Sequence, residues 1–248
     1  MRKIVILSTN SNPDYYLYAP YQERAWNKLG WEVAIMVTPD FDPLEMKLQN
    51  PDTYICRLPL IEGVRSETIA QAGRLYAHKF LDPEAMLMTC DMDLIPLSNY
   101  WNPTNLMTVY GHDLTWFNYY PMGYIAMLGK QWAKVMKGEG TVAQMMEADF
   151  KETKIAYSQQ WEEWWNVDWN LVTKRMKPFK NDITFINRGQ IDIAGATLAK
   201  GRIDRYNWEE TQQQPEPFID AHCENNNTRH PDKFGKFLNV FEKYYGKL

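Results

Sequence analysis

The sequence has few cysteines, no long apolar run and no excess of basic charge, and each shortage excludes a class of protein. Its three cysteines, Cys56, Cys90 and Cys223, are far apart and show no CxxC spacing. They cannot all pair within one chain, which favours reduced thiols in a cytosolic setting. The net charge of −4 gives no electrostatic footprint for a nucleic acid, so no nucleic-acid partner is expected.

Export and membrane signals are also missing from the pattern. The opening residues, MRKIVILSTN, join a basic end to a short apolar run that is too short for a signal peptide. No stretch approaches the ~20 apolar residues that a membrane-spanning helix needs. We therefore expect a cytoplasmic protein without a transmembrane segment.

Apolar and aromatic residues are plentiful instead. The chain is 45% hydrophobic and 14% aromatic, with ten tryptophans, which predicts a substantial core and excludes a disordered chain. Its 248 residues exceed the usual ~100–200 residues per domain but remain within reach of a single α/β domain.

The order of elements at the N-terminus predicts a parallel sheet with helices on its faces. Residues 3–9 (KIVILST) form a β-branched strand pattern, a helix is expected over 21–29, and a second strand over 31–38 stops at Pro39. Further strands are expected over 54–58, 85–90, 107–109 and 124–128, and further helices over 66–81, 131–137, from 141, 158–177 and 234–245.

Two aspartates, Asp91 and Asp93, follow directly after the expected strand over 85–90. Residues two apart in an extended segment point to the same side, so both carboxylates can converge on one point. The carboxyl edge of a parallel sheet is where ligands bind, and two close carboxylates favour a cation between them. The pair indicates a hard divalent cation shared with a diphosphate, or else a polar turn in which Asp93 caps the next element.

These features together resemble the GT-A fold of nucleotide-sugar glycosyltransferases. The resemblance rests on the strand, helix, strand opening, the helix with Arg74, and the apolar strand followed by DxD, and it extends over about residues 1–225. It implies a single α/β domain with a mixed, mainly parallel sheet flanked by helices. Residues 1–100 would form the nucleotide-binding half, 101–225 the acceptor-binding half, and 226–248 a C-terminal tail helix.

The resemblance also implies the ligands. The DxD would hold Mn²⁺ or Mg²⁺ against a nucleoside diphosphate sugar. The sugar would pass to a hydroxyl of a glycan or another acceptor, and binding of this acceptor would place the protein at the periphery of a membrane. Asp91, Asp93 and His222 would form the metal site. The residues implied for donor binding are Thr9, Asn10, Tyr15, Arg74, Asp91, Met92 and Gly123.

Asp168 is the residue expected to act as catalytic base. On the helix over 158–177 it shares an apolar stripe with residues such as Trp165 and Val172. A carboxylate on such an apolar stripe is costly to bury without a partner. Asp168 therefore either pairs with a backbone amide or an arginine such as Arg188, or acts as a base that deprotonates an acceptor hydroxyl, with inversion of the transferred sugar. The family often shows Glu before this Asp, whereas Val167 stands here.

Aromatic and basic residues complete the expected site. The cluster Trp116, Phe117, Tyr119 and Tyr120 is interpreted as an acceptor platform, with burial in the core as the alternative. Three basic residues late in the chain are either solvated charges or groups that neutralise the leaving diphosphate: Lys200, Arg202 and Arg205.

Two other functions stay open from the sequence. A haloacid-dehalogenase-like phosphatase would use Asp91 as nucleophile and Asp93 as acid, but its motif usually lies near the N-terminus and has Thr or Val where Ile95 stands. A non-enzymatic, cation-dependent carbohydrate-binding protein would use the aromatic residues and the carboxylate pair.

Overall fold

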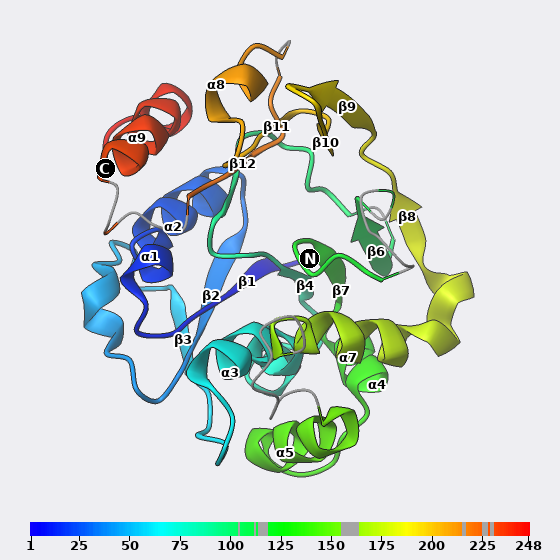
Figure 1. The fold of residues 1–248 in the computed structure, drawn as a ribbon. Helices are drawn as coiled ribbons and strands as arrows, with labels where there is room; N and C mark the ends of the chain where they lie inside the picture. Colours follow the sequence, from blue (N-terminus) through cyan, green and yellow to red (C-terminus); the bar gives the residue numbers. More distant parts are fainter. Residues whose placement is uncertain are drawn as a thin grey trace.

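A twisted sheet of seven strands forms the centre of the molecule in the computed structural model (Figure 1). The structure describes residues 1–103, 105–111, 113, 119–154, 164–214, 217–224, 228 and 231–248. In spatial order the strands are β3 (Tyr54–Arg57), β2 (Glu32–Val37), β1 (Lys3–Thr9), β4 (Met86–Thr89), β7 (Ile125–Leu128), β6 (Met107–Tyr110) and β8 (Thr184–Ile186).

Most neighbours in this sheet are parallel. β1 pairs in parallel with β2 and β4, β2 with β3, and β6 with β8, whereas β7 runs antiparallel to both β4 and β6. The mixed, mainly parallel sheet expected from the sequence is therefore confirmed. The β-branched run that predicted the first strand coincides with β1, residue for residue.

Helices cover both faces of the sheet, because successive strand residues point to opposite sides. Ile4 and Ile6 pack into a core with one helical layer, whereas Val5 and Leu7 pack into a second core with the other. The first layer holds α3 (Ser66–Gly73), the 3₁₀ helix η2 (Arg74–Lys79), α4 (Gly129–Met136), α5 (Val142–Thr153) and α7 (Val167–Met176). The second holds α1 (Pro13–Tyr16), α2 (Ala19–Lys28) and α9 (Pro231–Tyr245).

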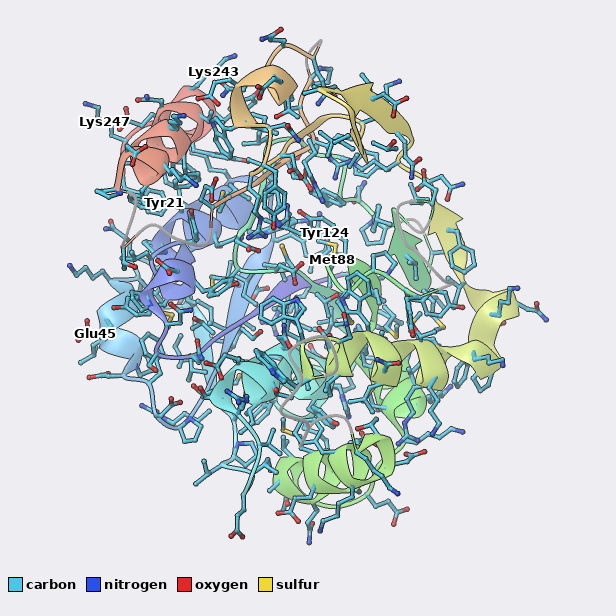
Figure 2. The ribbon with its side chains drawn as sticks, in the orientation of Figure 1. Tyr21, Glu45, Met88, Tyr124, Lys243 and Lys247 are labelled. Atoms are coloured by element: carbon cyan, nitrogen blue, oxygen red, sulfur yellow. The ribbon has the colours of Figure 1, made fainter. Side chains whose placement is uncertain are left out.

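Side chains fill the space between these layers. Figure 2 shows Met88 and Tyr124 in the interior, and both are at most 4% exposed, whereas Lys243 and Lys247 lie at the periphery. No helix within the described ranges is long and apolar enough to cross a membrane.

A second, three-stranded sheet brings two strands from the C-terminal part of the chain beside the segment that carries Asp91 and Asp93. In the order β11 (Arg202–Ile203), β12 (Asp220–His222) and β5 (Leu94–Pro96), β12 runs antiparallel to β5 and places His222 opposite Leu94. The backbone N–H of Cys223 donates to the carbonyl of Asp93 at 2.7 Å. The remaining elements are β9 (Gln190–Ile193), β10 (Ala196–Ala199), α8 (Trp208–Thr211), η1 (Pro43–Met46) and η5 (Lys177–Asp182).

Two helices differ from the expectation. The helix expected over 66–81 is α-helical only to Gly73 and continues as the 3₁₀ helix η2. Residues 165–166 form a turn, and α7 begins at Val167 because Asn166 has φ −104° and ψ 17°, outside the helical region. The expected single helix over 158–177 is therefore wrong at this turn, and its residues 158–163 lie outside the described part.

Candidate functional site

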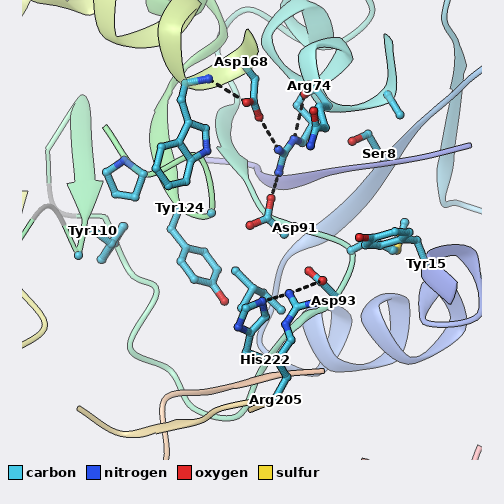
Figure 3. A pocket seen from close by; sticks show the side chains of 18 of the residues that line it. Ser8, Tyr15, Arg74, Asp91, Asp93, Tyr110, Tyr124, Asp168, Arg205 and His222 are labelled. Atoms are coloured by element: carbon cyan, nitrogen blue, oxygen red, sulfur yellow. Dashed lines mark hydrogen bonds and ion pairs between the residues drawn. The ribbon is translucent and has the colours of Figure 1, made fainter. Parts of the chain in front are cut away.

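A cavity of about 500 Å³ opens at the carboxyl ends of β1 and β4, the edge at which open α/β sheets bind ligands. Figure 3 shows acidic, basic and aromatic side chains pointing into it from several elements. The residues expected from the sequence for metal, donor and base chemistry all line it: Thr9, Asn10, Tyr15, Arg74, Asp91, Met92, Asp93, Gly123, Asp168 and His222.

Arg74 joins two of these acids. It is 4% exposed at the start of η2, its Nη1 donates to Oδ1 of Asp91, and its Nη2 donates to Oδ2 of Asp168 at 2.9 Å. Burial alone would lower the pKa of this guanidinium, but the two carboxylates outweigh it and the pKa is raised. Arg74 is therefore a fixed cation that sets the distance between Asp91 and Asp168.

Asp168 lies in the first turn of α7 and is 1% exposed. Its Oδ1 accepts a hydrogen bond from the backbone N–H of Trp169 at 2.8 Å, an arrangement that the helix N-terminus favours for a carboxylate. Burial raises the pKa of Asp168 to about 6, opposed by Arg74 and assisted by Asp91. The sequence offered Arg188 as the partner, whereas the structure gives Arg74.

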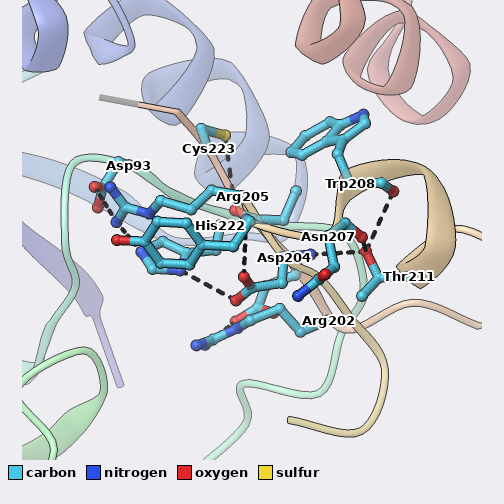
Figure 4. A network of polar contacts seen from close by, with 12 residues as sticks. Asp93, Arg202, Asp204, Arg205, Asn207, Trp208, Thr211, His222 and Cys223 are labelled. Carbon is cyan, nitrogen blue, oxygen red and sulfur yellow. Dashed lines mark hydrogen bonds and ion pairs between the residues drawn. The ribbon is translucent and has the colours of Figure 1, made fainter. Parts of the chain in front are cut away.

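Asp93 and His222 share one cationic partner, Arg205 (Figure 4). Nη2 of Arg205 donates to Oδ2 of Asp93 at 2.8 Å, and the same nitrogen contacts Nε2 of His222. Nδ1 of His222 lies 3.4 Å from Oδ2 of Asp204. Burial would raise the pKa of Asp93, but the neighbouring Arg205 and His222 lower it below its usual range.

A buried ion cluster supports β12 behind His222. The carboxylate of Asp220 is fully buried and accepts hydrogen bonds from both Arg188 and Arg202 at 2.7 to 3.0 Å. It also accepts the hydroxyl of Tyr124 at 3.1 Å. Although burial would raise the pKa of Asp220, the two guanidinium groups hold it far below the usual range. The cluster fixes the strand that carries His222.

A glutamine that the sequence reasoning missed holds the segment of the two aspartates. Gln22 of α2 is fully buried, and its Nε2 donates to the carbonyls of Asp91, Met92 and Leu94 at 3.1, 2.9 and 3.0 Å. Its Oε1 accepts the indole N–H of Trp26 at 2.9 Å. The available signal was a polar residue one turn before Trp26 on the buried side of a helix.

The residues at the end of β1 are held by local hydrogen bonds. The hydroxyl of Thr9 donates to the carbonyl of Asn10 at 3.1 Å, and Nδ2 of Asn10 donates to the hydroxyl of Ser66 at 3.1 Å. Gly123 lines the cavity near Asp91, and a Cβ there would lie 3.5 Å from Oδ2 of Asp91 and 3.1 Å from Cδ1 of Leu94. The missing side chain leaves room beside the first aspartate.

Of the expected aromatic platform, Tyr119 and Tyr120 do not line this cavity. Trp116 and Phe117 lie outside the described residues, Tyr120 is buried in the core, and Tyr119 has its ring 6.4 Å from that of Trp169. Among the described residues that line the cavity, the indoles beside Asp168 are Trp165 and Trp169. Of the expected basic residues, Arg202 and Arg205 line it and Lys200 does not.

Comparison with known proteins identifies the fold. No family model matches the sequence, and no curated protein matches it. Galactosyltransferase LgtC, solved in complex with donor and acceptor sugar analogs, matches with a TM-score of 0.54 and 13% identity over 99% of this chain and 96% of that one. An active-site mutant of LgtC matches with a TM-score of 0.54 and 13% identity over 98% and 95%.

A glycosyltransferase involved in glycosylation of the major capsid of PBCV-1 covers 95% of this chain and 99% of its own, with 11% identity and a TM-score of 0.47, too low to show a common fold. The LgtC structures do show one.

Proposed function

The chain has the GT-A-like fold of galactosyltransferase LgtC, and from this premise we propose that it is a glycosyltransferase. It moves a sugar from a nucleoside diphosphate sugar to a hydroxyl acceptor. One observation carries the proposal: Asp93 and His222, which are far apart in the chain, both contact the same guanidinium nitrogen of Arg205 inside the cavity at the carboxyl edge of the sheet. A cation at that point is what a bound diphosphate requires.

The donor would enter along the end of β1. Thr9, Asn10 and Tyr15 line this end of the cavity and would contact the base and ribose, with Met92 and Gly123 around the diphosphate and sugar. Residues 1–100 would thus form the donor half and residues 101–225 the acceptor half. The indoles of Trp165 and Trp169, beside Asp168, would face the acceptor sugar.

The donor atoms present suit Mn²⁺ or Mg²⁺. Carboxylate oxygens and an imidazole nitrogen are ligands for Mn²⁺, and Oδ2 of Asp93 and Nε2 of His222 both contact Nη2 of Arg205. Within the described residues no three His, Cys, Asp or Glu side chains form a complete metal cluster. Asp93 and His222 would therefore hold the ion together with Asp91 or the diphosphate, and the ion would offset charge on the leaving group.

Asp168 would remove the proton of the acceptor hydroxyl. A pKa of about 6 leaves its carboxylate ionised at neutral pH yet basic enough to accept a proton. Direct displacement with this base inverts the anomeric configuration of the transferred sugar. Proton NMR of the first-formed product tests this, and a product that keeps the donor configuration would rule out Asp168 as the base for direct displacement.

The experiment for the function is a screen of nucleoside diphosphate sugars with purified protein, in Mn²⁺ and in chelator. We expect one donor to be turned over in Mn²⁺, and Asp93→Asn to lose roughly a hundredfold or more, because both the metal and the diphosphate depend on it. Asp52→Asn, at an exposed acid, is the matched control and should retain activity. Near-normal turnover by Asp93→Asn would refute the central role of the carboxylate pair.

A further inference from the structure

Arg205 stands where the two expected metal ligands converge. It follows β11 in a turn, its side chain is 9% exposed, and its Nη2 bonds Asp93 while contacting His222. Figure 3 shows the guanidinium between these two side chains at the cavity wall. A cation of the protein itself therefore occupies the position at which Asp93 and His222 can share a ligand.

This arginine is held incompletely. Its Nε is buried and has no hydrogen-bond partner among the described residues, so the ion pair with Asp93 uses one nitrogen of the guanidinium. Arg188 is the contrast within the same chain, because its Nε donates to the carbonyl of Lys200 and both Nη atoms donate to Asp220. A buried donor without a partner costs free energy. Arg188 is therefore fixed, whereas a different side-chain conformation of Arg205 could give its Nε a partner.

The surroundings allow that movement. The backbone of the turn is fixed, since the N–H of Tyr206 donates to Oδ1 of Asp204 at 3.1 Å. The guanidinium also lies over the ring of Tyr206, 5.9 Å from its centroid, but this ring is 82% exposed and both residues line the cavity, so the contact can move with the side chain. Rotation of the Arg205 side chain can therefore redirect the guanidinium within the cavity without refolding the turn.

We propose that Arg205 is a displaceable stand-in for the divalent cation. In the free protein it neutralises Asp93 and excludes a metal ion from His222. When metal and donor bind, the guanidinium moves to the diphosphate, where Nε and Nη together can make a paired, charge-assisted contact. The inference that Arg205 competes with the metal rests on the contacts of Arg205 alone. The inference that it contacts a diphosphate rests on the proposed function.

The test is Arg205→Gln, measured in two binding experiments. Mn²⁺ alone, followed by electron paramagnetic resonance, should bind roughly tenfold or more tightly than to the wild type, because the competing cation is gone. Inorganic pyrophosphate in excess Mg²⁺, followed by calorimetry, should bind roughly tenfold or more weakly, because a charge-assisted contact is lost. A purely structural role would not move the two affinities in opposite directions.

Arg57→Gln, at an exposed arginine, is the control and should change neither affinity. If Arg205→Gln does not fold, Arg205→Lys carries the test: it should leave Mn²⁺ binding within about threefold and weaken pyrophosphate binding, since an ammonium cannot make the paired contact. Unchanged or weaker Mn²⁺ binding by Arg205→Gln, or unchanged pyrophosphate binding by either variant, overturns the proposal. If both affinities shift as expected but no donor is turned over, only the proposed glycosyl transfer fails.

Discussion

Replacing Gln22 by leucine removes the side chain that holds the segment of the two aspartates while nearly conserving its volume. In the wild type, the Gln22 amide satisfies the carbonyls of Met92 and Leu94 and the indole N–H of Trp26. The carbonyl of Asp91, the third acceptor, keeps the backbone N–H of Leu94 as a partner at 3.1 Å. Three buried polar groups therefore lose their principal partner in Gln22→Leu, and the carbonyl of Leu94 keeps only the weak donor Sγ of Cys90 at 3.3 Å.

At about 1 kcal/mol for each such group, the free energy of unfolding should fall by roughly 3 kcal/mol. In a chain of this size that corresponds to a melting temperature lower by roughly 6 to 12 °C. Urea denaturation gives the free energy, and Gln49→Leu, at an exposed glutamine, should change it by less than about 0.5 kcal/mol. A loss below about 1 kcal/mol in Gln22→Leu would show that the carbonyls find other partners and that the segment does not depend on this amide.

Two further predictions concern buried carboxylates. Turnover of the donor should rise as the pH is raised through about 6, because burial raises the pKa of Asp168 to that value and only the deprotonated form accepts a proton; a flat wild-type profile, or a rise that persists in Asp168→Asn, contradicts the assignment. Asp220→Asn should lower the free energy of unfolding by roughly 3 to 5 kcal/mol, because Arg188 and Arg202 lose their buried counter-charge. Since the pKa of Asp220 is depressed in the folded state, wild-type stability should also fall on acidification below about pH 4, and this fall should be smaller in the variant.

The sheet and the carboxylate pair were accessible from sequence because their signals are local. β-branched runs and helix breaks set β1, α2 and β2 to within two residues, and parallel order follows from the strand, helix, strand sequence. Asp91 and Asp93 come shortly after β4, which ends at Thr89, so their position at the carboxyl edge required only that the strand be recognised.

The partners of these acids were not accessible, because they depend on pairings between distant segments. His222 reaches Asp93 through the pairing of β12 with β5, and β5 has three residues, too few for a periodic signal. The break before α7 was not accessible either, because the apolar stripe continues through Trp165, whereas the backbone of Asn166 leaves the helical region and places Asp168 in a first turn. A stripe predicts which residues share a face and does not locate where a helix begins.

The balance of charge around the cavity explains why the aspartates that predict a metal site are paired with arginines. The residues that line it include as many guanidinium groups as carboxylates: Arg74, Arg188, Arg202 and Arg205 against Glu67, Asp91, Asp93 and Asp168. A diphosphate brought alone into this balanced lining would add uncompensated negative charge beside Asp91 and Asp93. A diphosphate that binds together with a divalent cation leaves the charge balance nearly unchanged, and the cation frees Arg205 from Asp93. Metal and diphosphate should therefore bind with positive coupling.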